Sequence, residues 1–201
     1  MTDWAVFTGD IVKSTKLAPE ALAAIFDGLH AADETLSAWQ DAPARLTRFR
    51  GDGWQMVIRP ALTFRALLTV RAAVRRAGKG FDTRIGVGIG PGEVAGDDLS
   101  GASGPAFVAA GRALDEMRRS TRMAAPEGPR DLQLCLPLAD EILGGWTARQ
   151  AEIAFLLLDP REPTQAQAAE ALGLTQQTVQ QQMDRSGLAG LLETCALMER
   201  P

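Results

Sequence analysis

Two Gly-Asp turns decide how the first part of this sequence folds. They are Thr8-Gly9-Asp10-Ile11-Val12, near the start of the chain, and Arg50-Gly51-Asp52-Gly53-Trp54, about forty residues later. Each Asp follows a Gly at the end of a short strand-like run, residues 4–7 in the first case and 46–49 in the second. A further run, residues 54–58, leaves the second turn. The pattern predicts three strands, the last two joined as a hairpin.

An amphipathic helix is predicted between the two turns, over residues 19–39, because apolar side chains recur there at three- and four-residue spacing. A right-handed strand–helix–strand crossover makes the first two strands parallel. The third strand then runs back antiparallel and can lie between them. The end of the first strand and the tip of the hairpin meet at one end of the sheet, so Asp10 and Asp52 are expected to lie close together.

Two neighbouring carboxylates repel each other unless a cation or a proton lies between them. Mg2+ or Mn2+, with phosphate oxygens as further ligands, would remove that repulsion. Lys13, Ser14 and Thr15, which follow Asp10, could hold phosphate oxygens. The alternative is that each Gly-Asp pair is only a turn, since both residue types favour turns.

The rest of the first part is predicted to alternate helices and strands. A helix is expected from residue 62 to a stop at residues 78–80, followed by a strand over 84–94. In that strand Gly alternates with Ile and Val, which leaves bare backbone on one face. Either a closely packed helix or a ligand could approach that face. A helix beginning at Pro105 and a short strand at residues 132–136 complete the prediction.

The 201 residues suffice for one medium domain and a small one. The sequence contains no apolar run long enough to span a membrane and no signal-peptide pattern. Cys135 and Cys195 are isolated thiols, which favours a reducing cytoplasm. His30 is the single histidine, which argues against a histidine-based mechanism. The net charge of −4 neither requires nor excludes a nucleic-acid partner.

Two segments are locally basic. Residues 65–84 carry six Lys or Arg side chains against Asp82 alone, and Arg118, Arg119 and Arg122 form a second group. We interpret both as solvated helix faces. The alternative is a patch for phosphates or an anionic partner.

Four sequence blocks, taken in order, resemble a known family. They are Gly-Asp-Ile-Val-Lys-Ser, Gly-Asp-Gly-Trp-Gln, Arg-Ile-Gly-Val-Gly-Ile-Gly and Gly-Ala-Ser-Gly-Pro-Ala-Phe-x-x-Ala-x-Arg-Ala-Leu. Together they are similar to the SatD family of small bacterial proteins and, more distantly, to the catalytic domain of class III nucleotidyl cyclases. The resemblance covers roughly residues 3–135.

The cyclase resemblance implies a ferredoxin-like palm that binds a nucleoside triphosphate and is completed by a homodimer interface. It places metal-binding roles on Asp10, Asp52 and the carbonyl of Ile11. Arg112 matches the arginine that steadies phosphate in the transition state, and Arg48 matches a base-selecting position. The sequence also departs from the cyclase pattern. Val108 replaces a ribose-orienting Asn, a base-reading Asp has no clear counterpart, and a later strand with a triphosphate-binding Lys is missing.

From residue 137 the composition changes to short predicted helices. Thr147 is predicted to cap one helix, and residues 164–174 form another that ends at a Gly. Ala169, Gly173 and Val179 have the spacing of a helix-turn-helix, and residues 146–190 resemble that motif of bacterial transcription regulators. The side chains expected to face double-stranded DNA are polar: Thr175, Gln176, Gln177, Gln180, Gln181 and Arg185.

The sequence therefore predicts an α+β ferredoxin-like, cyclase-like palm over residues 1–136 and a small all-α helix-turn-helix domain over 137–201. We expect a cytoplasmic, homodimeric, DNA-binding transcriptional regulator that responds to a metal-bound nucleotide and has no membrane partner. One alternative is an active metal-dependent cyclase or nucleotidyl transferase. A second is an inert dimerisation and protein-interaction module, which the scarcity of cations after residue 146 favours because DNA affinity depends on phosphate neutralisation.

Overall fold

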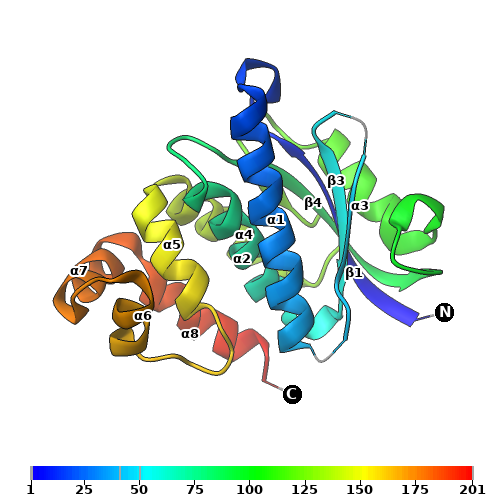
Figure 1. The fold of residues 1–201 in the computed structure, drawn as a ribbon. Coiled ribbons are helices and arrows are strands. Elements are labelled where there is room, and N and C mark those ends of the chain that lie inside the picture. The colour runs from blue at the N-terminus through cyan, green and yellow to red at the C-terminus, as the bar shows by residue number, and fades with distance from the viewer. Residues whose placement is uncertain (1, 41, 50, 201) are drawn as a thin grey trace.

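A mixed sheet covered by helices on both faces forms the first part of the molecule (Figure 1). The computed structural model describes residues 2–40, 42–49 and 51–200, so Arg50 of the second Gly-Asp turn lies outside the described residues. The elements up to the last strand are β1 (Thr2–Ile11), α1 (Pro19–Trp39), β2 (Arg45–Arg48), β3 (Gly53–Ile58), α2 (Thr63–Arg76), β4 (Thr83–Gly92), α3 (Pro105–Asp115) and β5 (Met123–Ala124). Five helices follow: α4 (Arg130–Gly144), α5 (Ala148–Leu157), α6 (Gln165–Leu172), α7 (Gln176–Ser186) and α8 (Leu188–Met198).

The predicted strand arrangement is confirmed. Within the described residues the strand order is β2-β3-β1-β4-β5, and β3 pairs antiparallel with both β1 and β2. Strands β1 and β2 are therefore parallel, with β3 between them, and β4 pairs antiparallel with β1 on its other side. This is the βαββαβ order of a ferredoxin-like fold, extended by α3 and the short β5, which pairs parallel with β4.

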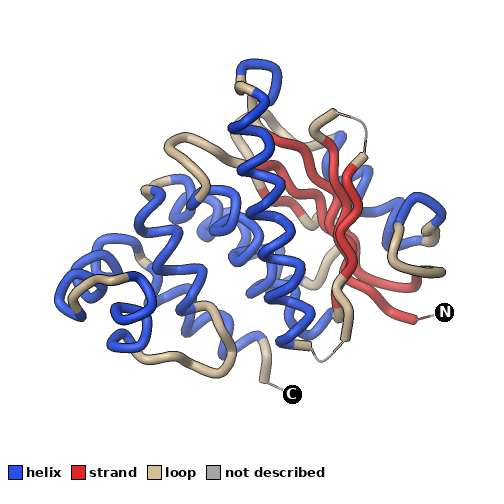
Figure 2. Tube along the Cα trace, in the orientation of Figure 1, coloured by secondary structure: helices blue, strands red, loops and turns tan. Residues whose placement is uncertain are grey.

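Helices α1 and α2 cover one face of the sheet, and α3 covers the other (Figures 1 and 2). The glycines of β4 explain how α3 comes so close. A Cβ atom at Gly86 or Gly88 would overlap the backbone carbonyls of Ala110 and Ala106 on α3. Of the two explanations for the Gly-rich strand, helix packing is therefore the correct one, and no ligand needs to approach that face.

We predict that Gly88→Ala lowers the free energy of unfolding by about 2 kcal/mol or more, because the added methyl group would force α3 away from the sheet. Gly111→Ala is the matched control, since a Cβ there meets open space on α3. That control is expected to stabilise the helix by about 0.5–1 kcal/mol. Urea denaturation measures both changes, and equal stability of the two variants would contradict the packing explanation.

The segment at residues 132–136 forms part of helix α4, so the strand predicted there is wrong. Leu132 and Leu136 are buried while Leu134 is 62% exposed. Leucines at every second residue fit one face of a strand, which is why the sequence pattern predicts a strand. The two buried leucines are four residues apart, however, and the buried residues Ala139 and Leu143 continue that helical spacing. The predicted domain boundary at residue 137 lies inside this helix.

The C-terminal helices share one hydrophobic core with the sheet instead of forming a separate core. Side chains from β1 and α2 belong to the same buried cluster as Trp146, Phe155, Val179 and Cys195. Helix α2 is central to it, because it contacts α1 on one side and α4, α5 and α8 on the other. Burial raises the pKa of the Cys195 thiol to about 12, so this cysteine is a core residue and not a reactive one.

The basic stripe of α2 is not a solvated face, which corrects the prediction. Arg65 and Arg71 are 5% and 0% exposed. Arg71 donates to Asp82 at 2.9 and 3.1 Å and to Asp140 of α4 at 2.6 Å. Arg65 donates to both carboxylate oxygens of Glu199, at 2.6 and 2.7 Å. These arginines join the helix to carboxylates of the C-terminal part, since buried charges require such partners.

We predict that Arg71→Ala lowers the free energy of unfolding by about 3–5 kcal/mol, because it leaves the carboxylate of Asp140 without its cation and removes one of the cations that pair with Asp82. Arg118→Ala, at an exposed position, should change stability by less than about 0.5 kcal/mol. Chemical denaturation followed by circular dichroism measures both. A loss below about 1 kcal/mol at Arg71 would show that the ion pairs do not hold the two parts together.

None of the helices in the described part of the chain is both long and apolar enough to cross a bilayer.

Candidate functional site

The ends of β1 and of the β2–β3 hairpin come together as predicted. Asp10 lies opposite Gly53 in the β1–β3 register, so Asp52 is only one residue beyond the pairing. Both aspartates are partly exposed, whereas Ile11 is buried. Ser14 bridges the two segments, because its hydroxyl donates to a carboxylate oxygen of Asp52. We call Asp10, Ser14 and Asp52, together with the arginine described next, the acidic end of the sheet.

Arg84 is the residue of this site that the sequence did not reveal. It lies directly opposite Asp10 in the β1–β4 register. Its Nε donates to one carboxylate oxygen of Asp10 at 2.9 Å, and its Nη2 donates to the other. The hydrogen bonds to Asp10 raise the pKa of Arg84, and the charges of Asp10 and Asp52 raise it further. The sequence predicts a cation, namely a metal ion, beside the two carboxylates, and the structure shows that the guanidinium of Arg84 already lies beside Asp10.

A buried tryptophan fixes the backbone at the end of β1. The Trp54 indole donates to the hydroxyl of Thr83 at 3.0 Å, and that hydroxyl donates to the carbonyl of Asp10 at 2.7 Å. A Cβ at Gly9 would overlap the Trp54 ring, so only Gly fits beneath it. The Gly of the first turn is required by this packing, which holds Asp10 in place.

The acidic end offers oxygen ligands of the kind that Mg2+ and Mn2+ prefer. Asp10, Asp52 and the carbonyl of Ile11 are the residues that would hold such an ion. Arg84 engages both carboxylate oxygens of Asp10, so a metal ion would compete with the guanidinium. No cluster of three or more His, Cys, Asp or Glu suited to a metal occurs among residues 2–40, 42–49 and 51–200. These oxygen atoms are of the type that binds a divalent ion, and the binding of such an ion here stays a prediction.

Of the three residues expected to hold phosphate, Ser14 belongs to the acidic end, and Lys13 and Thr15 are its neighbours in the sequence. Ser14 and Thr15 begin a short 3-10 turn, and Lys13 precedes it with a left-handed backbone, at φ 56°. Lys13 and Thr15 are exposed. Their phosphate-binding role stays a prediction, because the turn has only three residues and is not the start of an α-helix.

The two arginines matched to the cyclase pattern have other partners. The Arg48 guanidinium lies 3.8 Å from the centre of the Phe26 ring and donates to the carbonyl of Gly51 at 3.2 Å. Arg112 pairs with Glu127 at 2.9 Å. Neither has an observed contact with Asp10 or Asp52 in the described part of the chain, so their catalytic and base-selecting roles stay predictions.

A second candidate surface lies on α6 and α7, two helices joined by a short turn. Gly173 ends α6 in a left-handed conformation, at φ 62°. Thr175 caps α7, its hydroxyl accepting from the backbone of Thr178 at 3.1 Å. Ala169 and Val179 are buried, as the predicted spacing requires. The side chains predicted to contact DNA are all exposed: Thr175, Gln176, Gln177, Gln180, Gln181 and Arg185.

Comparison with known proteins gives structural similarities alone. No protein-family model matches the chain, and no curated protein does. The catalytic core of a rhodopsin-guanylyl cyclase with converted specificity, solved with ATPalphaS, is similar over 58% of this chain and 73% of that one, at 19% identity and a TM-score of 0.43. The guanylyl cyclase Cya2 matches at 14% identity and a TM-score of 0.43, covering 61% and 73% of the two chains. A bacterial light-regulated adenylyl cyclase matches at 16% identity and a TM-score of 0.42, covering 60% and 73%. At these values the activities of the three enzymes cannot be transferred to this chain.

We predict that Arg84→Ala makes the fold more dependent on divalent ions. Without the guanidinium, Asp10 and Asp52 repel each other, so the melting temperature in EDTA should fall. Adding 10 mM Mg2+ or Mn2+ should then raise it by about 3–5 °C for a Kd of ~1 mM, and by less in the wild type.

The control for this experiment is the double variant Asp10→Ala/Arg84→Ala, which should lose the metal-dependent gain. Differential scanning calorimetry measures all three proteins. If the single and double variants gained equally from the metal, the ion would be bound elsewhere.

Proposed function

We propose that this protein is a DNA-binding regulator whose palm binds a metal-bound nucleotide without turning it over. The observation that supports it most directly is the surface of α7. This helix presents five of the six exposed polar side chains predicted to contact DNA, its capping residue Thr175 presents the sixth, and Val179, which anchors the helix, is fully buried. A helix anchored on one side and polar on the other can enter a major groove, where Gln can pair with adenine edges.

The helices behind α7 support the same proposal. Helix α5 packs against both α6 and α7, and Thr147 starts it with a capping box. The Trp146 indole, before α5, donates to the carbonyl of Ser186 at the end of α7, at 2.7 Å. A recognition helix must be held rigidly if its side chains are to meet base edges, and these contacts provide that support.

The acidic end of the sheet supports the nucleotide part of the proposal. Asp10 and Asp52 would hold Mg2+ or Mn2+, which supplies charge neutralisation for phosphate oxygens. Arg84, beside Asp10, is a guanidinium of the kind that binds phosphate in a bidentate manner. Binding without turnover is favoured because Val108 replaces the ribose-orienting Asn of the cyclase pattern, and the strand with the triphosphate-binding Lys is missing.

Few cations surround α7, so we propose that two copies bind DNA together. Arg185 is the one cation among the six side chains expected at the DNA. Phosphate contacts dominate DNA affinity, and a dimer would double the number available to one molecule. The homodimer stays part of the proposal.

We predict that the protein binds DNA from upstream of its own gene in a salt-dependent manner. The double variant Gln176→Ala/Gln177→Ala should weaken binding by about tenfold or more, because each pairing of a Gln with a base contributes ~1–3 kcal/mol. Gln133→Ala, an exposed Gln on α4, is the matched control and should bind like the wild type. Fluorescence polarisation at 50 and 200 mM salt, with and without Mg2+ and each nucleoside triphosphate, measures this.

Two results of that titration would reject the regulator. One is the absence of salt-sensitive binding under every condition. The other is a double variant that binds as tightly as the Gln133→Ala control, which would place DNA contacts away from α7. Production of a new nucleotide from any triphosphate in the same mixtures would instead favour the active enzyme.

A further inference from the structure

A cavity of about 520 Å³ lies where the loop after α2 meets the start of α5. Gly78, Lys79 and Phe81 line it from the loop, and Trp146 and Arg149 line it from the C-terminal helices. Its volume is within the range that small organic ligands occupy in proteins. The acidic end of the sheet and the α7 surface contribute no residue to it.

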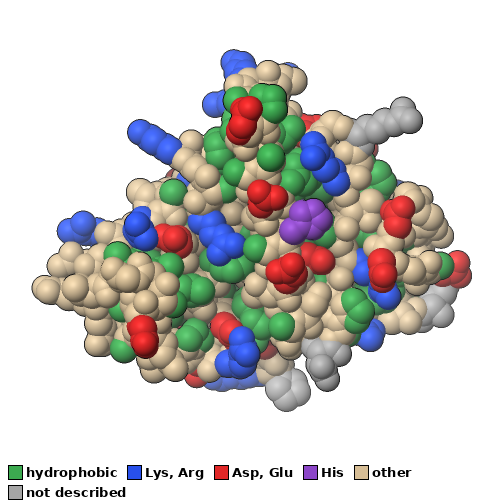
Figure 3. Space-filling view, in the orientation of Figure 1, with side chains coloured by type: hydrophobic (Ala, Val, Ile, Leu, Met, Phe, Trp, Pro, Cys, Tyr) green, Lys and Arg blue, Asp and Glu red, His purple; other side chains and the backbone are tan. Residues whose placement is uncertain are grey.

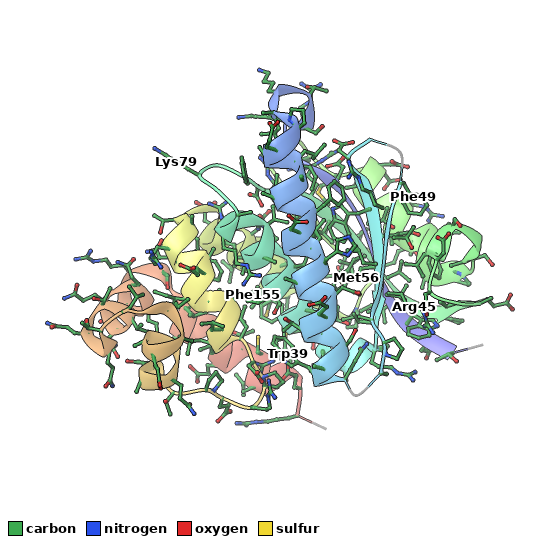
Figure 4. All side chains as sticks on the ribbon, in the orientation of Figure 1. Trp39, Arg45, Phe49, Met56, Lys79 and Phe155 are labelled. Carbon is green, nitrogen blue, oxygen red and sulfur yellow. The ribbon has the colours of Figure 1, made fainter. Side chains whose placement is uncertain are left out.

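The walls of this cavity combine aromatic rings with positive charge. Phe81, which is partly exposed, provides most of the aromatic surface, and the small exposed part of Trp146, 4% of the residue, adds to it. Arg75, Lys79 and Arg149 provide the charge. No Asp or Glu is among its lining residues in the described part of the chain. Figure 4 shows Lys79 extending from the loop after α2, close to α5, and Figure 3 shows several Lys and Arg side chains over this part of the surface.

The carboxylates that pair with these arginines lie outside the lining. Arg75 donates to Asp82 at 3.0 Å, and Arg149 pairs with Glu152 at 2.5 Å. The first backbone N–H groups of α5 have no acceptor within the helix, which adds partial positive charge beside Arg149. Carboxylates thus offset part of the charge of Arg75 and Arg149, while Lys79 has no ion pair among the described residues. Lys79 and the start of α5 favour an anion, and the partly exposed ring of Phe81 favours an apolar, flat body attached to it.

A second cavity, lined in part by Arg71, differs in the charge of its lining residues. It has a volume of about 450 Å³, and its lining includes Arg71 and Arg122 but also Asp82 and Asp140. Because cations and carboxylates offset each other in that lining, its charge favours neither an anion nor a cation. Of these two cavities, the one beside Trp146 has aromatic residues and no carboxylate among its described lining residues.

We propose that the cavity lined by Phe81, Trp146, Lys79 and Arg149 binds a small organic anion that carries an aromatic ring. Lys79 and Arg149 hold the anionic group, and the rings of Phe81 and Trp146 pack against the ring of the ligand. Charge complementarity and the volume of the cavity argue for this class of ligand over a neutral molecule or a peptide.

This site is connected to α7 by direct contacts. Arg75 donates to the carbonyl of Trp146 at 2.5 Å, and the Trp146 indole donates to the carbonyl of Ser186 at the end of α7, at 2.7 Å. A ligand that packs against Trp146 therefore restrains the residues that hold α7. The consequence for DNA binding rests on the proposed function, whereas ligand binding and the restraint of α7 do not.

Isothermal titration calorimetry of the full chain with three probes tests the site. Naphthalene-2-carboxylate has both a ring and a charge, 2-naphthalenemethanol has the ring alone, and inorganic phosphate has the charge alone. We expect naphthalene-2-carboxylate to bind about tenfold more tightly than either of the other probes, because only it uses both the charged groups and the aromatic walls.

Two matched variants show whether binding occurs at this cavity. Lys79→Gln/Arg149→Gln should weaken naphthalene-2-carboxylate by about tenfold. Lys16→Gln/Arg118→Gln removes the same charge at exposed positions that do not line the cavity, and should leave binding unchanged. Equal binding by the two variants would overturn the site. So would equal affinity for the neutral alcohol, or no binding of any probe at millimolar concentration.

Hydrogen exchange of the α7 amides gives a readout that does not depend on DNA. Naphthalene-2-carboxylate should slow exchange in α7 of the wild type and not in Lys79→Gln/Arg149→Gln. Unchanged exchange with the probe bound would overturn the connection to α7. If the probe slows exchange in α7 but the protein binds no DNA, the ligand site is supported and the proposed DNA-binding function is rejected. The two proposals can therefore fail independently.

Discussion

The buried guanidinium of Arg71 is the contact on which the rest of the structure depends. Its side chain is fully buried, and it binds Asp82, which directly precedes β4, and Asp140, in α4. A charge in such a position is tolerated only when it is paired. Removal of Arg71 would leave Asp140 without its cation, whereas Asp82 would keep Arg75 at 3.0 Å. The sheet and the C-terminal helices therefore cannot separate without a large electrostatic cost, which is why they form one core instead of two.

Helix α2 consequently fixes the position of the C-terminal helices and also contributes side chains to the core. Arg65 binds Glu199 near the end of the chain, and Arg75 binds the backbone at Gly144 and Trp146. The same helix packs on α1 and, together with it, covers one face of the sheet. Helix α7 is thus fixed relative to the sheet through paired charges and not through a flexible linker. A regulator built this way would respond by small shifts of packed helices.

The sheet topology followed from the order of the elements, because crossover handedness and hairpin geometry are local rules. The position of Asp10 beside the hairpin followed from the same rules. Arg84 did not, since the β1–β4 register that places it opposite Asp10 depends on packing along the whole strand. The buried arginines of α2 were also missed. Periodicity identifies two faces of a helix, but it cannot show that the polar face meets carboxylates such as Asp140, which is 69 residues beyond Arg71.

The pairing of Asp10 with Arg84 also bears on how the acidic end could bind a ligand. With Arg84 in place, one of the two aspartate charges is already offset, so a divalent ion alone gains little there. A phosphate alone meets a guanidinium that is engaged by Asp10 and lies near the charge of Asp52. A metal ion and a phosphate together satisfy every group, because the ion takes the carboxylates while the guanidinium takes the phosphate. The charges at this end of the sheet therefore favour a ligand that brings both, which is the physical reason for proposing a metal-bound nucleotide over either component alone.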